Sequence, residues 1–216
     1  MIDNHIEVKF FTSHYLIRLL SHKLRIKKSI QIWLNTLSMS VFIYYYQIDF
    51  EYQPEYLASS TQKYPHMSKL NRCLVIYLIE SLFFDQLNDP VMVLHHIASS
   101  FGLLLGLRGH FLGAINNCLL NELSSIWLSL FTLARKSSNR IINNTSFGLL
   151  LMFLYSFLEN RVIPLTRMNY IFWTNINYFS KVDYWYLIFM LCIIHTSIQY
   201  YWLQLMLKKI ILRIVK

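Results

Sequence analysis

A pair of adjacent histidines and a short carboxylate–hydroxyl motif are the residues of this chain best suited to chemistry. His95 and His96 lie in a long apolar stretch, and Glu122, Ser124 and Ser125 lie in the next one. An imidazole can act as a general base near neutral pH, and a carboxylate beside it orients the ring and stabilises its charged form. The pattern therefore predicts proton transfer to or from a bound molecule.

Further polar residues interrupt the apolar stretches. An ionisable side chain at membrane depth costs several kcal/mol unless it is paired or wetted, so each one is a candidate functional group. The set comprises Glu80, Asp85, Asp89, Asn117, Asn121, Glu159, Arg161, His195 and Gln199. Structural alternatives remain open: the histidines as helix-packing groups, His195 and Gln199 as a packing pair, and Arg161 snorkelling to the interface.

The metal-ligating residue types do not form a recognisable metal motif. Adjacent histidines point about 100° apart on a helix, so His95 and His96 cannot bind one metal ion from the same face. A haem or zinc site would need a ligand from another helix, such as His195. The three cysteines, Cys73, Cys118 and Cys192, are widely spaced and form neither a disulfide framework nor a CxxC site. No metal and no other cofactor is predicted.

The elements that position these residues are apolar runs of the length needed to cross a bilayer. The chain is 55% hydrophobic and only 14% charged, against about 25% charged in soluble domains. This composition excludes a soluble enzyme or a nucleic-acid binder. Runs of about 20 apolar residues can span the hydrocarbon layer; the candidates are residues 29–47, 72–87, 91–107, 111–133, 146–165 and 184–207. The predicted fold is an all-α integral membrane protein, a six-helix transmembrane bundle with a central polar cavity.

The distribution of basic residues predicts the orientation. Thirteen Lys and Arg residues fall in connections on one side and six on the other, apart from Arg161 within a span. By the positive-inside rule both termini are cytosolic. Two overlapping glycosylation sequons, at Asn143 and Asn144, disagree because they lie in a predicted cytosolic loop. Residues 1–28 are predicted to be a cytosolic amphipathic segment, with a seventh span within 10–28 as the alternative, and residues 210–216 a basic cytosolic tail.

Helical spacing predicts which residues face the cavity. His95, Ser99, Gly102 and Gly106 share a small, polar stripe that suits close helix packing or a cavity wall. In the span 111–133, two neighbouring polar stripes form an arc, made of Asn117, Asn121 and Ser124 and of Cys118, Glu122, Ser125 and Ser129. We expect this arc to face the histidine-bearing helix, with Arg161 toward the lumenal end of its own span.

Residues 89–96, 121–125 and 161–164 together resemble the TLC (TRAM–LAG–CLN8-like) domain family, and the resemblance extends over roughly residues 71–209 and the first span. The resemblance implies a TLC-like transmembrane domain over 29–209. Ceramide synthases of this family use paired histidines to move an acyl group from acyl-CoA to a sphingoid amine, with an Asp-x-Ser-Asp run in the following helix. Glu122 and Ser124 match the first Asp and the Ser, but Ser125 replaces the second Asp. The chain therefore looks more like the TLC-domain-containing branch, linked to phospholipid composition or lipid trafficking.

The resemblance implies a role in membrane lipid homeostasis in the endoplasmic reticulum, with membrane lipids and acyl-CoA as partners. In the enzyme hypothesis, His95 or His96 is the general base, Glu122 orients the imidazolium, and Asn121 or Ser124 donates to the developing oxyanion. The predicted substrate-binding set is Asp89, Asn121, Ser124, Ser125 and Arg161. The alternative is a non-catalytic lipid-binding, lipid-sensing or trafficking protein that uses the same cavity.

Overall fold

The computed structural model describes residues 6–24, 27, 30, 31, 33, 34, 36–38, 41, 51–59, 65–84, 89–119 and 121–214. Most of the predicted first span, 29–47, lies outside this part of the chain, as do Asp85 and the side chain of Glu80. Every regular element within it is helical, so the all-α prediction is confirmed. The helices are α1 (Ile6–Lys23), α3 (Pro54–Leu57), α4 (Pro65–Phe84), α5 (Pro90–Leu107), α6 (Leu112–Cys118), α7 (Asn121–Arg135), α8 (Arg140–Asn144), α9 (Ser146–Phe157), the π-helical η1 (Leu158–Val162), α10 (Ile163–Thr174), α11 (Ile176–Phe179) and α12 (Trp185–Ile214).

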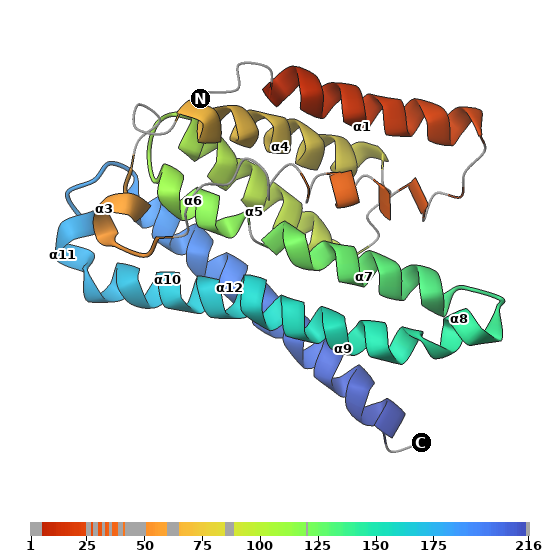
Figure 1. Ribbon diagram of the computed structural model, residues 1–216. Helices are drawn as coiled ribbons and strands as arrows, with labels where there is room; N and C mark the ends of the chain where they lie inside the picture. Colours follow the sequence, from red (N-terminus) through yellow and green to blue (C-terminus); the bar gives the residue numbers. More distant parts are fainter. Residues whose placement is uncertain are drawn as a thin grey trace.

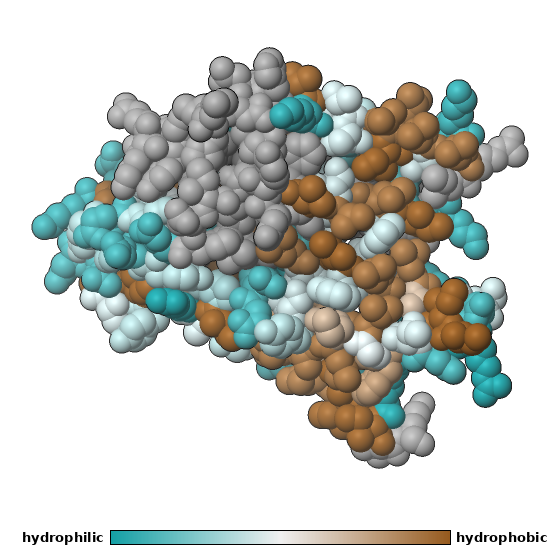
Figure 2. All heavy atoms as spheres, in the orientation of Figure 1, coloured by the Kyte–Doolittle hydropathy of each residue, from teal (hydrophilic) through white to brown (hydrophobic). Residues whose placement is uncertain are grey.

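Three of the described helices are long and apolar enough to cross a membrane: Pro90–Leu107, Arg140–Thr174 and Trp185–Ile214. They correspond to the predicted third, fifth and sixth spans. The fifth is longer than predicted, because α8, α9, η1 and α10 run on almost without interruption (Figure 1). In the view of Figure 2, hydrophobic side chains gather over α7, α9 and α12, and hydrophilic ones lie near α3 and α11.

The prediction of one continuous helix over 111–133 is wrong. Phe111 has a left-handed backbone, with φ of 56°, and starts the short helix α6, which ends at Cys118. A separate helix, α7, begins at Asn121 and has 15 residues, which gives it a length of about 22 Å at 1.5 Å per residue. A bilayer core is about 30 Å thick, so α7 alone is too short to cross it upright.

The start of α5 agrees with the sequence. Asp89 is the N-cap residue, and its side chain accepts a hydrogen bond of 2.9 Å from the backbone N–H of Val91. Pro90 follows in the first turn, where its missing N–H and its fixed φ are compatible with a helix. This cap fixes where the helix begins and therefore which way His95 and His96 point.

The helices pack as two adjoining groups (Figure 1). One apolar core lies among α4, α5, α6, α10 and α12, and a second lies among α7, α9 and α12. Gly106 permits a close approach in the first core, because a Cβ there would lie 2.6 Å from Cδ1 of Ile115 on α6. The long helix α12 contributes to both cores and so connects the two groups.

Helix α1 lies alongside α4 (Figure 1). Phe10 of α1 is buried, and the ring of His14 lies 5.6 Å from that of Tyr77 on α4. Large apolar residues of α1 on the other side, such as Leu16 and Leu19, are exposed. The predicted N-terminal helix is therefore present, and its position relative to the membrane remains a prediction.

Candidate functional site

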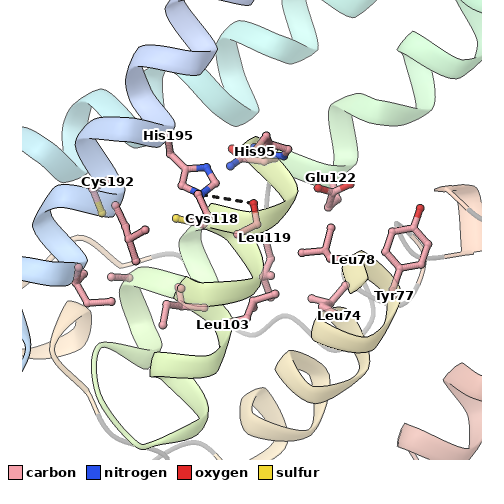
Figure 3. A pocket seen from close by; sticks show the side chains of 18 residues that line it. Leu74, Tyr77, Leu78, His95, Leu103, Cys118, Leu119, Glu122, Cys192 and His195 are labelled. Atoms are coloured by element: carbon pink, nitrogen blue, oxygen red, sulfur yellow. Dashed lines mark hydrogen bonds between the residues drawn. The ribbon is translucent and has the colours of Figure 1, made fainter. Parts of the chain in front are cut away.

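Two pockets meet at His95 and Glu122. The narrow pocket has a volume of about 70 Å³ and is mostly apolar, with leucines of α4, α5 and α12 in its wall (Figure 3). The wide pocket has a volume of about 420 Å³, and both polar and apolar residues line it. Both pockets are lined by Tyr77, Leu78, His95 and Glu122. The imidazole of His95 and the carboxylate of Glu122 therefore stand at the junction between an apolar and a polar compartment.

His95 projects from α5 toward α12 and is only 4% exposed. Its ring centroid lies 5.2 Å from that of His195 and 5.2 Å from that of Trp202, both on α12. Its Nδ1 atom is buried and makes no hydrogen bond with any residue that the structure describes. His195 is held in turn by Ser99 of α5, whose Oγ lies 3.5 Å from its Nε2.

The half-buried His96 has a defined tautomer. Its Nδ1 lies 2.9 Å from the backbone carbonyl oxygen of Met92. A carbonyl oxygen only accepts, so the neutral ring carries its proton on Nδ1 and has a lone pair on Nε2. His96 also lines the wide pocket. Of the two histidines, it is therefore the one whose environment specifies a nitrogen able to accept a proton.

Arg161 connects η1 to the start of α7. Its Nε donates to Oγ of Ser124 and its Nη2 to Oγ of Ser125, both at 2.6 Å. The side chain is 5% exposed, its charge interacts with that of Glu122, and its guanidinium carbon lies 5.5 Å from the ring centre of Phe157. The snorkelling alternative is therefore wrong: Arg161 points inward and lines the wide pocket.

The remaining predicted residues divide between the pockets. Asn121 is buried in the wall of the narrow pocket, and its Oδ1 has no hydrogen-bond partner among the described residues. Ser125 and Asp89 line the wide pocket, where Asp89 also serves as the cap of α5. Ser124 is fully buried; its hydroxyl donates to the carbonyl oxygen of Asn121 at 2.9 Å and accepts from Arg161.

The break between α6 and α7 divides both predicted polar stripes: Asn117 and Cys118 lie on α6, and the other residues of the two stripes lie on α7. Asn117, on α6, uses its Nδ2 to donate to the carbonyl oxygen of Glu51 at 2.8 Å, so it anchors the preceding loop. The other stripe does line the site: Cys118 borders the narrow pocket, Ser129 borders the wide one, and Glu122 borders both.

Two residues that the sequence analysis does not single out, Trp202 and Lys209, also line the wide pocket. A signal for Trp202 was available: it follows His195 by seven residues, which places the two on one helix face. Among the described residues, no group of three or more His, Cys, Asp or Glu side chains is placed to hold one metal ion.

Comparison with known proteins identifies the family. Residues 25–208 match the family model of the TLC domain. No curated protein sequence and no solved structure matches the chain at a significant level. The match covers most of the chain, including the histidine pair, Glu122 and Arg161, and it agrees with the all-helical, apolar architecture. The chain belongs to the TLC-domain family.

Proposed function

We propose that the protein acts in membrane lipid homeostasis by transferring an acyl group to an amine or hydroxyl of a lipid. The observation that carries the proposal is the junction of the two pockets at His95 and Glu122. An acyl donor has an apolar chain on one side of its carbonyl and a polar carrier on the other. The apolar pocket suits the part of the chain next to the carbonyl, and the wide polar pocket suits the carrier and the acceptor. The reacting carbonyl then lies beside the imidazole.

The tautomer of His96 supports a role as the base. Its Nε2 would take the proton from the acceptor amine or hydroxyl as the acceptor oxygen or nitrogen attacks the carbonyl carbon of a thioester such as acyl-CoA. Collapse of the tetrahedral intermediate breaks the carbon–sulfur bond, and the departing thiolate receives the proton from the imidazolium. Glu122, which borders the same pocket, would stabilise the imidazolium while it exists.

Donors to the developing oxyanion can be chosen from the contacts. The Ser124 proton is already donated to the carbonyl oxygen of Asn121. Arg161 uses Nε and Nη2 for the two serines, and its guanidinium carries further N–H groups. We therefore assign the oxyanion contact to Arg161 or to the side-chain amide of Asn121, which border the wide and the narrow pocket respectively.

The test is a pair of substitutions with a matched control. His96→Ala and His95→Ala should change the cellular lipid profile while the protein level and the unfolding temperature in detergent stay near those of the wild type. His110→Ala is the control, because His110 lies outside both pockets and its ring packs against Tyr184 at 5.1 Å. A lipid profile that is unchanged in both site variants, with normal protein level, would refute the catalytic proposal.

The contacts of Arg161 favour a second candidate, a lipid-binding protein without catalysis. The guanidinium is held by two hydroxyls next to a carboxylate, which gives a rigid polar wall beside an apolar pocket. Such a wall can bind a headgroup with no proton transfer. In this case His96→Ala would leave the lipid profile unchanged, whereas Arg161→Lys, which keeps the charge but not the paired hydrogen bonds to the two serines, would reduce crosslinking to a photoactivatable lipid in samples whose unfolding temperature shows that the protein is folded.

A further inference from the structure

A third pocket, apart from the histidines, is lined by basic residues. It has a volume of about 290 Å³, and its lining consists of Phe131, Arg135, Leu150, Lys209, Leu212 and Arg213. Arg135 comes from the last turn of α7, whereas Lys209 and Arg213 come from the end of α12. No Asp or Glu is among these lining residues. Three cations from two helices thus converge on one hollow without a carboxylate in its wall.

We infer that this basic pocket is a binding site for a phosphate group, carried either by a membrane lipid or by a soluble acyl carrier. Guanidinium groups match phosphate oxygens through paired hydrogen bonds, and an ammonium adds a compact positive charge. Beneath the cations, Phe131 and Leu150 are buried, at 7% and 2% exposure, and provide an apolar floor. A cationic rim above an apolar floor matches an amphiphile whose phosphate lies at the membrane surface.

Arg213 is already oriented for this role. Its Nη1 and Nη2 lie 3.3 Å and 3.4 Å from Oγ of Ser146, a residue that is 2% exposed on α9. One hydroxyl positions the guanidinium at the pocket, and the serine does not neutralise the charge. Ordering a long side chain in advance lowers the entropy that binding must overcome.

Cations near helix ends have a simpler explanation. Basic residues stabilise helix C-termini, and cytosolic connections are rich in Lys and Arg. The helix-end explanation covers Lys136, which follows the last turn of α7, and the cytosolic-connection explanation covers both Lys136 and Arg140; neither residue lines the pocket. If general surface charge is the whole explanation, substituting any of these basic residues should weaken phosphate binding equally. If the pocket is a phosphate site, only substitutions of the pocket residues should weaken it strongly.

The phosphate has two sources, an anionic phospholipid or a soluble phosphate carrier of the acyl group. Lys209 lines both this pocket and the wide pocket of the candidate site, so either source could be relevant to lipid chemistry. The site itself does not depend on the proposed acyl transfer. Its test therefore measures binding and not activity.

The experiment uses the full chain in nanodiscs of phosphatidylcholine, titrated with phosphatidic acid and, separately, with coenzyme A. The double variant Arg135→Gln/Arg213→Gln removes two pocket charges, and Lys136→Gln/Arg140→Gln removes two charges outside the pocket. At roughly a fivefold effect per basic residue, the pocket variant should bind about 30-fold more weakly, and the control by less than about threefold. Ser146→Ala, which changes no charge, should weaken binding by about two- to threefold.

The outcomes separate the sources and the alternatives. Pocket-dependent binding of phosphatidic acid alone identifies a lipid phosphate, and pocket-dependent binding of coenzyme A identifies the soluble carrier; either result supports the site. Equal loss in both double variants would overturn it in favour of general surface charge. No loss in either variant would overturn it as well. Unfolding temperatures measured on the same samples show that each variant is folded.

Discussion

Replacing Arg161 by Met should destabilise the protein strongly. Methionine keeps the apolar stem but removes the guanidinium, and with it the contact of the guanidinium carbon with the Phe157 ring. Two charge-assisted hydrogen bonds of 2.6 Å, to Ser124 and Ser125, are lost. Each is worth about 1.5–3 kcal/mol when one partner is charged. The half-buried Glu122 also loses the positive charge with which it interacts.

The magnitude follows from what is left behind. The loss of two charge-assisted hydrogen bonds, with Ser124 left buried, puts the cost at about 3–6 kcal/mol. We expect this range for Arg161→Met. In the double variant with Glu122→Gln, no carboxylate is left without a counter-charge, so the combined loss should be smaller than the sum of the single losses by about 1–2 kcal/mol.

The assay is reversible unfolding in mixed micelles, with all four members of the cycle measured under identical conditions. Asn160→Leu is a suitable neighbouring control, because the Asn160 amide donates only to Ser156 within its own helix. A loss below about 1 kcal/mol for Arg161→Met would refute the reasoning. Strict additivity in the cycle would show that the two charges do not stabilise each other.

Three further predictions test the packing, the pocket and the orientation. Gly113→Ala should lower the free energy of unfolding by about 3 kcal/mol or more, because the added Cβ would overlap the backbone oxygen of Tyr56. Gly148→Ala is the control: its Cβ would have no atom within 4 Å, so it should be neutral or stabilising in the same unfolding assay. Gly102→Ala adds a methyl group to the narrow pocket without a clash, because the nearest atom would be 3.8 Å away. Under the acyl-transfer proposal the transferred acyl chains should become shorter in the lipid profile. An unchanged chain-length distribution would argue against an acyl chain entering this pocket. Tags at both termini should be accessible from the cytosol in selectively permeabilised cells, and glycosylation at Asn143 or Asn144, at the end of α8, would show that the orientation is the opposite.

The sequence was informative where local signals and tertiary packing agree. The apolar run predicted from residue 91 begins within one residue of the start of α5, which the cap of Asp89 fixes. The stripe of small residues was compatible with helix packing or a cavity wall, and the structure contains both: Gly106 packs closely against α6, and Gly102 borders the narrow pocket. The spacing identifies the helix face that carries these residues. It does not tell close packing from a pocket wall, because that depends on which residues of the neighbouring helices face each glycine.

The break between α6 and α7 was not predictable by the same reasoning. Neither glycine nor proline marks positions 119–120, and hydropathy continues across them. The short helix α6 is instead held from outside: Asn116 donates to the hydroxyl of Tyr56, and Asn117 donates to the carbonyl oxygen of Glu51, both at 2.8 Å. Contacts between residues about 60 positions apart leave no local pattern in the chain.

The inward position of Arg161 did have a signal. It follows Phe157 and precedes Leu165 by four residues each, and both are buried, so the charge lies on the apolar stripe of its helix. Its partner could not be deduced, because a stripe identifies the inward face and not the residue opposite. The neighbouring Glu159 is exposed, because side chains two positions apart point to nearly opposite sides of a helix.

The backbone geometry of η1 and the charges at the start of α7 explain why Glu122 stabilises the buried Arg161. Pro164 has no N–H for the carbonyl four residues earlier, and the helix passes this point through the wider turn of η1. Arg161 then reaches Ser124 and Ser125 in the first turns of α7, where the helix dipole disfavours a cation. The carboxylate of Glu122 offsets that dipole. Glu122 therefore contributes to stability as well as to any stabilisation of an imidazolium, so Glu122→Gln would lower both. Catalysis is tested more cleanly at His96, whose described hydrogen bond stays within α5.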